Sequence, residues 1–363
     1  MRDLWSGARS LAGIVSRHHV FAGPRSVALA ISDVCNTNCI MCSCHSPLLE
    51  PKGVAADPYM EPRIFEGILR ECRAMGTFRV VLGGNGEPSL HPQFDEMLKL
   101  MNELGMEPYV LTNGLALDET RVKLWASLRA HYRFSIHAGD EQTFLEGHPN
   151  GRPGQFERLT RAMKALVSSG RPKVSAMHVI HKANFRHVRE MIEHAREVGM
   201  KEVLFRPVRA LKALAPVVLT PEEERELRPE LERCLKLAQM FGIHTNLREY
   251  LENSLWIDSG TVDTAHLYRK IPCYIGWIYA EFDRDGTMRP CLHSKRVMGR
   301  VGERPIREMW NSPEYWAFRE EARAMPRSRK LVTGCACSQC CMAKYNVNLY
   351  NLLHLRSFRY GKA

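Results

Sequence analysis

The sequence predicts an α/β protein in which an open, partial, TIM-like (β/α)6 barrel precedes a small C-terminal α+β domain. Two observations lead to this prediction. From residue 27 to about residue 240, apolar β-branched segments alternate with segments of helical periodicity, and connections long enough to hold a helix join strands in parallel. From about residue 271 this alternation stops, and a short hairpin, short helices and six of the twelve cysteines follow.

The repeating units carry local start and stop signals. Asp118 and Asn184 are expected to cap helices, and Gly76, Gly170 and Gly199 to end them. Strands are expected at 26–32, 78–83, 107–112, 133–138, 173–180 and 202–206. Helices are expected at 61–75, 92–104, 119–130, 155–169, 185–198 and 221–241. Six units rather than eight indicate an open barrel, whose ligands should gather at the C-terminal ends of the strands.

Four regions follow from these patterns. We expect residues 1–26 to form an N-terminal helical extension, 27–242 the barrel, 243–270 a linker and 271–363 the small C-terminal domain. In that last region the turn Asp285-Gly286 predicts a β-hairpin. Ser312 and Pro313 predict the start of a short helix that runs to about Ala324.

Composition places the chain among ordinary globular proteins. It is 45% hydrophobic and 25% charged, and no apolar run approaches the ~20 residues of a membrane helix. The N-terminus has an acid at Asp3 and a short apolar stretch, so it is a poor signal peptide. The cysteines are clustered, which is typical of metal ligands in a reducing compartment. We therefore expect a cytoplasmic protein with no membrane contact.

The positive charge of the chain is unevenly distributed. The formal net charge is +11, and residues 152–189 carry nine Lys or Arg residues against the single acid Glu157. After Glu321 eight Lys or Arg residues follow with no acid at all. Nucleic acid is disfavoured as a partner because no basic motif interleaved with aromatic residues accompanies the charge. An acidic substrate stays open.

Three closely spaced cysteines follow the first predicted strand. Cys35, Cys39 and Cys42 have three and then two residues between them. A zinc site normally takes four ligands in two close pairs, whereas three thiolates suit an iron–sulfur cluster with one iron left unligated by protein. A small molecule can bind such an iron. A zinc knuckle or chance clustering is the alternative.

A glycine-rich segment with a carboxylate, Gly83-Gly-Asn-Gly-Glu-Pro88, ends the second predicted strand. Glycines allow close approach of a ligand to the backbone, and the carboxylate can pair with a cation. Together with the three cysteines, this segment resembles the radical S-adenosylmethionine (SAM) superfamily. The resemblance implies that Cys35, Cys39 and Cys42 hold a [4Fe-4S] cluster whose free iron SAM chelates. It further implies a role for Gly84, Gly86, Glu87 and Pro88 in binding SAM, with Glu87 receiving the methionine amino group.

Further residues match positions that contact SAM in this superfamily. Ser135 corresponds to a position that binds ribose and carboxylate, and Ile180, with Val179, to positions that flank the adenine. His137 and Arg206, at the ends of the fourth and sixth strands, are candidate catalytic residues that contact SAM or substrate. Met41 departs from the family pattern, in which an aromatic residue before the third cysteine contacts adenine. Its polarizable thioether can still pack there.

The C-terminal cysteines give a second signal. Cys273 and Cys291 bracket the predicted hairpin, and Cys337 and Cys340 form a Cys-x-x-Cys pair. This arrangement resembles the SPASM extension of radical SAM enzymes and, more closely, its shortened twitch form. The resemblance implies that these four cysteines ligate one auxiliary [4Fe-4S] cluster. A second auxiliary cluster is disfavoured because no cysteine follows Cys341. A structural zinc ion is the alternative, and Cys335 or Cys341 stays open as a replacement ligand.

The resemblance also implies a reaction. A reductant such as flavodoxin or ferredoxin supplies one electron, SAM is cleaved to a 5′-deoxyadenosyl radical, and the radical removes hydrogen from a substrate C–H. Some family members use a free cysteine as hydrogen-atom donor, for which Cys341 is the candidate, beside Cys44 and Cys335.

The single auxiliary cluster led us to expect a sugar-like or aminocyclitol-like small molecule, which would be oxidised or epimerised. The first alternative is a peptide-modifying maturase that crosslinks or epimerises its substrate. Such enzymes often carry a leader-binding domain, and only about 26 residues precede the first predicted strand. The second alternative is a non-catalytic iron–sulfur or zinc protein, which would have no use for Glu87.

Overall fold

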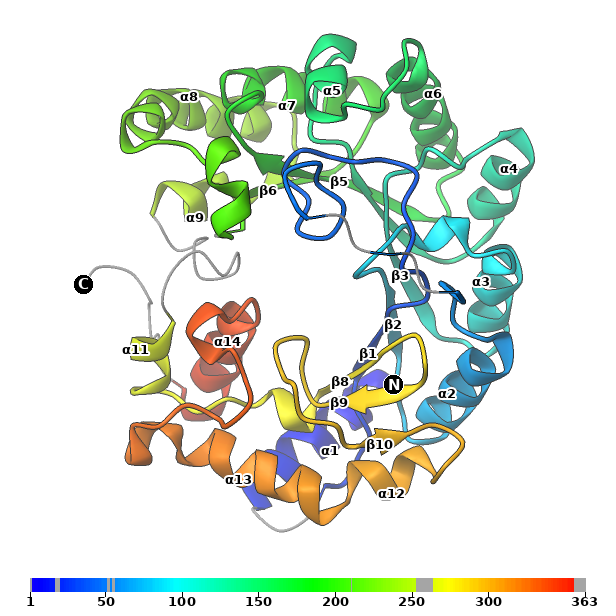
Figure 1. The fold of residues 1–363 in the computed structure, drawn as a ribbon, viewed down its shortest axis with the longest axis vertical. Helices are drawn as coiled ribbons and strands as arrows, with labels where there is room; N and C mark the ends of the chain where they lie inside the picture. Colours follow the sequence, from blue (N-terminus) through cyan, green and yellow to red (C-terminus); the bar gives the residue numbers. More distant parts are fainter. Residues whose placement is uncertain are drawn as a thin grey trace.

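One ten-stranded sheet curves round a central space, and helices cover its outer side (Figure 1). This is a computed structural model, and it describes residues 2–16, 20–50, 53, 56–209, 211–252 and 264–355. The strand order is β10-β9-β8-β1-β2-β3-β4-β5-β6-β7, and all neighbours from β8 to β7 pair in parallel. The predicted α/β class and partial barrel are therefore confirmed.

The barrel strands lie close to their predicted positions. They are β1 (Ser26–Leu29), β2 (Arg79–Leu82), β3 (Glu107–Thr112), β4 (His131–Ser135), β5 (Lys173–Ile180) and β6 (Glu202–Pro207). The main outer helices are α2 (Pro62–Ala74), α3 (Phe94–Glu103), α4 (Glu119–Ser127), α6 (Gln155–Ser168), α7 (Val188–Val198) and α8 (Pro221–Met240). Alternate strand residues such as Val80 and Leu82 are fully buried against these helices, as period-2 burial requires. The short helix α5 (Glu141–Gly147) is an addition that periodicity did not indicate.

Most predicted caps are present, with one informative exception. The Asp118 side chain accepts from the Arg121 backbone N–H, and Thr220 and Glu223 form a capping box at the start of α8. Asn184, however, does not cap a helix, because a 3-10 turn, η2 (Phe185–His187), precedes α7. Its side-chain amide instead donates to the backbone oxygens of His137 and Val179, and so joins the ends of β4 and β5.

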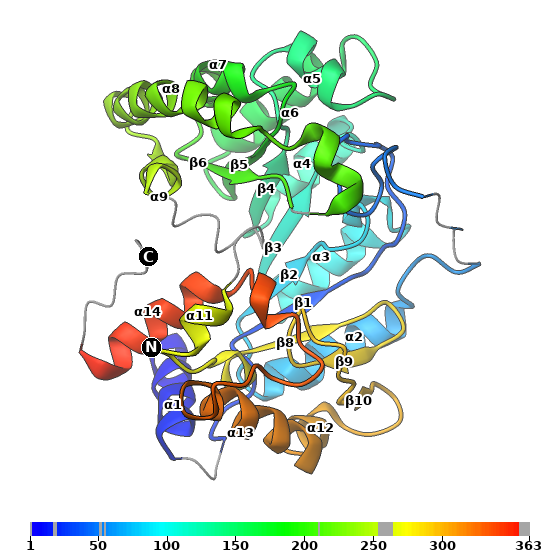
Figure 2. The same cartoon turned by 60° about the vertical axis from the view of Figure 1, so that its left-hand side comes forward.

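The predicted hairpin exists, but it does not form a separate sheet. Its strands are β8 (Tyr279–Phe282) and β9 (Thr287–Arg289), with the short β10 (Gly299–Arg300) beside β9. The hairpin is antiparallel within itself, and β8 also pairs in parallel with β1. The C-terminal region therefore extends the barrel sheet at its β1 edge (Figure 2). This region also holds η4 (Ile275–Trp277), α12 (Ile306–Trp310), α13 (Pro313–Ser328), η5 (Cys337–Gln339) and α14 (Ala343–His354).

The segment expected to be a linker contains structure at both of its ends. β7 (His244–Thr245) pairs with β6, and α9 (Leu247–Leu251) follows it. The Asn246 side chain accepts from Phe205 N and donates to Phe205 O, so this part belongs to the barrel. At the other end lies α11 (Ala265–Tyr268). The middle of the predicted linker, 253–263, lies outside the described residues.

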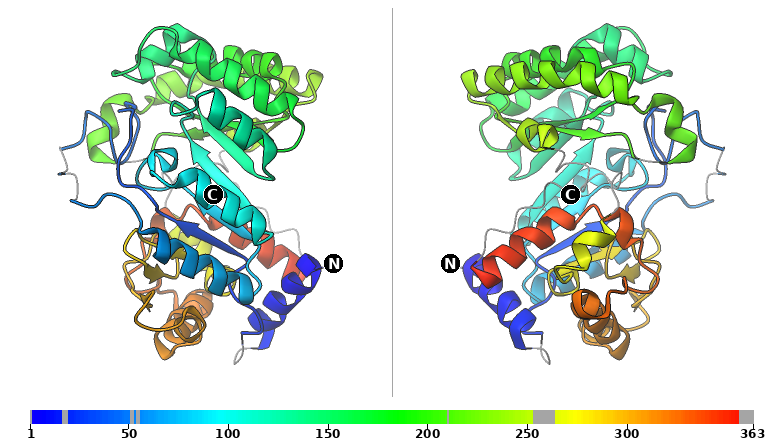
Figure 3. Two further views of the ribbon diagram at one scale, coloured as in Figure 1. Left: turned by 90° about the vertical axis from the view of Figure 1, so that its right-hand side faces the viewer. Right: turned by 90° about the vertical axis from the view of Figure 1, so that its left-hand side faces the viewer.

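The N-terminal helix α1 (Arg2–Ser16) packs against the C-terminal region (Figure 3). Arg323 of α13 donates to the Ile14 backbone oxygen, and the Trp310 indole donates to the Ala22 oxygen at 3.0 Å. The two ends of the chain therefore support each other. In the part of the chain that the structure describes, no helix combines the length and apolarity needed to cross a membrane.

Glu281 on β8 is a buried carboxyl group with an unpaired oxygen. Its side chain is 8% exposed, and Oε2 has no hydrogen-bond partner among the described residues. Burial, and then the neighbouring charge of Asp283, raise the pKa of Glu281 to about 7, while Arg289 opposes this shift. Arg289 itself donates to Asp283. The folded protein therefore binds a proton here that the unfolded chain, with a pKa of about 4.3, releases.

We predict that this group makes stability fall as pH rises from about 4.5 through 7, because only the folded state must keep the proton. Glu281→Gln should remove that loss, which makes the variant more stable than the parent at pH 8 by roughly 2–3 kcal/mol and nearly equal to it at pH 4.5. Urea unfolding across this pH range measures the difference. A constant difference between variant and parent across the range would contradict the assignment.

The turn of the hairpin contacts the loop that follows β1. Arg284 Nε donates to Asp33 Oδ2 at 2.8 Å, and its guanidinium also donates to the Asp57 backbone oxygen. Asn85 Nδ2 donates to the other oxygen of Asp33 at 3.0 Å. Asp33 thus ties the hairpin turn to the loops that follow β1 and β2.

We predict that Arg284→Ala lowers the free energy of unfolding by about 1–2 kcal/mol, since this ion pair is only about a quarter exposed. A double-mutant cycle with Asp33→Ala should give a coupling energy of about 1 kcal/mol. The matched control is Arg300→Ala, whose pair with Asp285 on the same hairpin is about half exposed and should matter little. Equal losses in both arginine variants would refute the role of Asp33.

Candidate active site

The cysteine loop lies at the C-terminal end of β1, where the barrel rule places a reactive centre. The glycine-rich loop after β2 packs directly on it. Glu87 N donates to Val34 O at 2.8 Å, and a Cβ added at Gly86 would lie 2.3 Å from that same oxygen. Any side chain at position 86 would therefore push the two loops apart, which explains the glycine.

Asn150, in the loop after α5, holds the cysteine loop from the opposite side. Its Oδ1 accepts from Thr37 Oγ1 at 3.3 Å and from Asn38 N at 3.1 Å. Its Nδ2 donates to Asn36 O at 3.1 Å, and its backbone N–H donates to Asn38 Oδ1 at 3.0 Å. One side chain thus fixes three consecutive residues between Cys35 and Cys39.

The Glu87 carboxylate is buried and receives four hydrogen bonds. Oε1 accepts from Ser89 N, Ser89 Oγ and Thr112 Oγ1, and Oε2 accepts from Asn113 N at 2.7 Å. Burial nevertheless dominates and raises the pKa of Glu87. Because Oε1 already has three donors, Oε2 is the atom with room for a further cation. A cation there would favour the ionised carboxylate.

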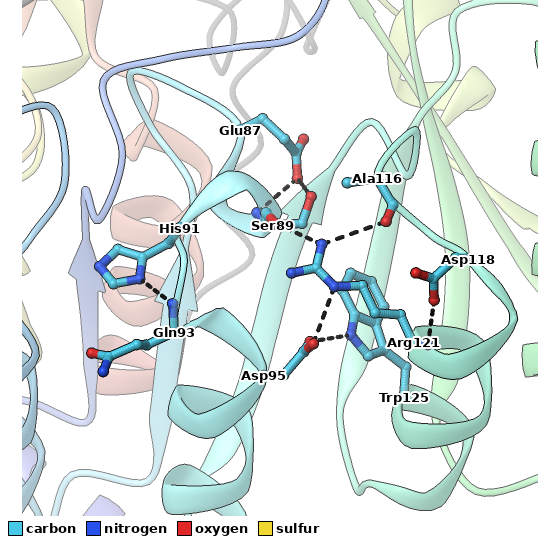
Figure 4. Close-up of polar contacts among 9 residues, drawn as sticks. All are labelled: Glu87, Ser89, His91, Gln93, Asp95, Ala116, Asp118, Arg121 and Trp125. Carbon is cyan, nitrogen blue, oxygen red and sulfur yellow. Dashed lines mark hydrogen bonds and ion pairs between the residues drawn. The ribbon is translucent and has the colours of Figure 1, made fainter.

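A second group of polar contacts supports Ser89 from below (Figure 4). Arg121 Nη1 donates to the backbone oxygen of Ser89 at 2.9 Å, and Arg121 Nε donates to Asp95 at 3.1 Å. Asp95 also accepts from the indole of the fully buried Trp125. Helices α3 and α4 therefore hold η1 (Pro88–Leu90), the short turn that presents Ser89 to Glu87.

A cleft of about 410 Å³ opens between these loops, the ends of β3–β6 and the C-terminal region. Most of the predicted site residues line it. Its described lining includes Cys35, Cys39, Met41, Cys42, Gly84, Gly86, Glu87, Ser135, His137, Arg206 and Cys341. These eleven predicted residues therefore converge on one cavity, although they come from five separate strand ends or loops.

Two of the residues predicted to bind SAM, and the four predicted auxiliary-cluster cysteines, lie outside this lining. Pro88 is buried as the first residue of η1, where its fixed backbone suits the start of a turn. Ile180 is 1% exposed and belongs to the apolar core. Its neighbour Val179 lines the cleft instead, since successive residues of a strand face opposite sides. If adenine packs on β5, Val179 is the residue placed to contact it.

His137 occupies a strained position at the end of β4. Its φ of +58° is unusual for a residue with a side chain. Its Nδ1 accepts from Val179 N at 3.0 Å, and its ring stacks on His148 at 5.9 Å between centroids. Burial, and then the neighbouring histidines, lower the pKa of His137 well below its usual value. The imidazole is therefore neutral, with Nε2 carrying its proton.

Hydrogen-bond donors point at the sulfurs of the cysteine loop that follows β1. Cys42 Sγ accepts from the backbone N–H groups of Cys44 and His45, and Cys35 Sγ accepts from Asn113 Nδ2 at 3.7 Å. Burial raises the pKa of Cys35 and of Cys39, so bare thiols here would stay protonated. Donors aimed at sulfur suit metal-bound thiolates. The residues present therefore fit an iron–sulfur cluster.

The C-terminal cysteines form a second group near the cleft. The thiols of Cys273, Cys291, Cys337 and Cys340 lie close enough to influence one another's ionisation, and Cys335 and Cys341 join them. Cys340 Sγ accepts from the Tyr268 hydroxyl at 2.9 Å and from Met342 N at 3.3 Å. Thr264 accepts from Cys340 N and donates to Cys337 O. These contacts fit a second group of metal-bound thiolates.

Sequence reasoning missed several residues of this site. Asn113 joins Glu87 to the cysteine loop, since its side chain also donates to Asn36 Oδ1 at 2.7 Å. Thr112 and Asn150 were missed as well. The run Thr112-Asn113-Gly114 at the end of a predicted strand was an available signal for the first two. Nothing in the spacing marks Asn150.

Comparisons with known proteins agree with this geometry. The radical SAM superfamily matches residues 29–202, and an iron–sulfur cluster-binding domain, SPASM, matches residues 273–342. PqqA peptide cyclase of Gluconobacter oxydans is 26% identical over 86% of this chain and 86% of its own length.

Two solved structures share the fold. Streptococcus suis SuiB with S-adenosylmethionine has a TM-score of 0.63 and 17% identity, covering 87% of this chain and 72% of SuiB. The protein anSMEcpe with AdoMet has a TM-score of 0.62 and 16% identity, covering 92% of this chain and 98% of that one.

One expectation from the sequence is wrong. The predicted sugar-like or aminocyclitol-like substrate rested on the single auxiliary cluster. PqqA peptide cyclase, which this chain matches over 86% of both lengths, is named for a peptide substrate. The structure of SuiB has also been solved with its precursor peptide SuiA. The number of cysteines after residue 271 therefore does not define the substrate class.

The two matched regions together cover about two thirds of the 363 residues and contain both cysteine groups and the cleft between them. The cofactors of such a chain are S-adenosylmethionine and [4Fe-4S] clusters, with an auxiliary cluster in the second region. The chain belongs to the radical SAM superfamily, and it carries a SPASM iron–sulfur cluster-binding domain after its barrel.

Proposed function

We propose that this protein is a radical SAM maturase that modifies a peptide, by crosslinking or by epimerising a residue. The observation that carries the proposal is the similarity to a peptide cyclase over 86% of both chains. The position of the cleft supports it. Barrel strand ends line one side, and Leu292, His293 and Cys341 of the C-terminal region line the other.

Each part of the cleft has a proposed role. Cys35, Cys39 and Cys42 hold the cluster that binds SAM, and Glu87 Oε2 accepts the SAM amino group. Cys273, Cys291, Cys337 and Cys340 hold the auxiliary cluster. When bound, SAM and its cluster supply a carbon-centred radical that removes a hydrogen atom from the substrate.

The remaining side chains position the substrate and exclude water. In this proposal Ser135 and Val179, which line the cleft, contact SAM, and Met41, from the cysteine loop, covers it. His137, held neutral, offers an N–H donor toward the cavity. Cys341 lines the same cavity and is the thiol placed to return a hydrogen atom to a substrate radical.

The electron enters from a separate protein in this proposal. A flavodoxin or ferredoxin is the class of donor that delivers single electrons at low potential. A reducing compartment such as the cytoplasm suits the twelve cysteines, none of which forms a disulfide among the described residues.

The proposal predicts that reduced, anaerobic holoprotein changes a peptide and consumes SAM in doing so. We expect peptides encoded beside its gene to lose two hydrogens on crosslinking, or to exchange one for solvent deuterium on epimerisation. Mass spectrometry of the peptide and assay of 5′-deoxyadenosine measure both. SAM turnover that depends on an added small molecule, with every peptide unchanged, would sink the proposal.

The two cysteine groups should be separable by mutation. Two [4Fe-4S] clusters give the parent about eight irons per chain. We predict that Cys39→Ala binds about half as many and forms no 5′-deoxyadenosine. Cys340→Ala should also lose about half, but keep SAM cleavage without product. Iron assay and product analysis after anaerobic reconstitution test this. Equal effects of the two variants on SAM cleavage would contradict the assignment of roles.

The Tyr268 hydroxyl gives a milder probe of the auxiliary group. Tyr268→Phe removes a donor to Cys340 Sγ without removing a ligand. Since hydrogen bonds to sulfur raise the potential of a cluster, the auxiliary potential should fall. The potential of the SAM-binding cluster in the same sample is the control and should not move. Redox titration followed by electron paramagnetic resonance reads both, and an unchanged auxiliary potential would count against Cys340 as a ligand.

A further inference from the structure

The cleft carries positive charge at the side that faces the C-terminal region. Arg206 and Arg209 line it from the end of β6 and the loop that follows, and His293 lines it from beyond β9. Among the described lining residues Glu87 is the only acid. Its carboxylate is buried and bonded to Ser89, Thr112 and Asn113, and its Oε2 is assigned above to the SAM amino group, so it is not the partner of either arginine.

Arg209 is the cation of this group that is available to a ligand. It is exposed, and no carboxylate of the described residues pairs with it. His293 also lines the cleft and lies close enough to Arg209 to be influenced by its charge. An imidazole carries no negative charge in any of its forms, so His293, whose Nε2 accepts from Cys341 N at 3.4 Å, is not a counter-ion for Arg209.

An apolar surface adjoins this cation. Leu292 lines the same cleft and is 51% exposed, which is unusual for a leucine in a cavity wall. A ligand that reaches Arg209 can therefore bury an apolar group on Leu292. A peptide offers both features on neighbouring side chains, a carboxylate on one and an apolar group on the next.

Resting on the function proposed above, we propose that the substrate is an acidic peptide and that Arg209 binds a Glu or Asp side chain close to the residue that reacts. A guanidinium matches a carboxylate through two parallel hydrogen bonds. Arg209 lies near His293, which in turn contacts Cys341, and all three line the cleft. The ion pair between Arg209 and the peptide would therefore hold the neighbouring peptide residue inside this cleft.

The alternative role for Arg209 is to offset the negative charge of the auxiliary cluster. The two roles differ in what they predict. Charge compensation changes the reduction potential of the cluster when Arg209 is replaced, and leaves peptide selectivity untouched. If Arg209 instead binds an acidic side chain of the peptide, its replacement changes the ratio of the affinities for a peptide that contains Glu and for the same peptide with Gln in that place.

The test uses anaerobic holoprotein with SAM and no reductant, so that binding is read without turnover. A display library of random twelve-residue peptides is selected on the parent, on Arg209→Gln and on the control Arg186→Gln. Arg186 is an exposed arginine paired with Glu226 on the outer surface. One selected peptide and its Glu→Gln counterpart are then synthesised, and their affinities are measured at low and high salt.

We expect Glu or Asp to be enriched at one position with the parent and with Arg186→Gln, but not with Arg209→Gln. The synthetic pair should differ about tenfold in affinity for the parent, less at high salt, and hardly at all for Arg209→Gln. Arg209→Glu should favour Lys or Arg at that same position.

Other outcomes separate the proposed role of Arg209 from the proposed maturase function. Peptides enriched without an acidic position, or a preference that survives Arg209→Gln, would overturn the role of Arg209 and leave the maturase proposal intact. A shift in auxiliary potential with unchanged selectivity would assign Arg209 to charge compensation. No enrichment of any peptide by the parent would overturn both proposals.

Discussion

The whole site depends on one backbone contact between two loops. Glu87 N donates to Val34 O, and Gly86 lies so close to that oxygen that only glycine fits. This contact sets the cysteine loop against the only acid that lines the cleft among the described residues. Asn113 completes the joint, because it bonds both to Glu87 and to the cysteine loop. A cluster and a sulfonium ligand can then be held in one fixed relation, which is the preorganisation that radical chemistry requires.

Local patterns predicted the barrel but not the extension of its sheet by the C-terminal region. Period-2 and period-3.6 burial is encoded within each segment, so strands such as β3 and β5 lie where the sequence placed them. Pairing of β8 with β1 joins residues some 250 positions apart, and no local signal specifies it. The contacts of Asn184 are also non-local. Its side chain donates to the backbone oxygens of His137 and Val179 instead of capping a helix, and no local pattern predicts that.

The site was predictable where spacing carries chemistry. The spacing of three cysteines and a Gly-Glu-Pro segment resembles the radical SAM pattern, and the fold brings both to one cleft. Asn150 and Arg209 have no such signature, since their role depends on which loop the fold brings beside them. Val179 rather than Ile180 faces the cleft because strand parity is set by the sheet. The number of auxiliary cysteines carries no comparable information about the substrate, and the sugar-like prediction that rested on it was wrong.

Electron paramagnetic resonance of the dithionite-reduced protein, with and without SAM, tests the central claim most directly. The protein should show two reduced clusters, and SAM should change the signal of one and leave the other unaltered. That result requires one iron open to a ligand in the cleft and one fully ligated cluster beyond it. Two cluster signals that are both unchanged by SAM would contradict the account. So would a protein that contains zinc and shows the signal of one cluster only.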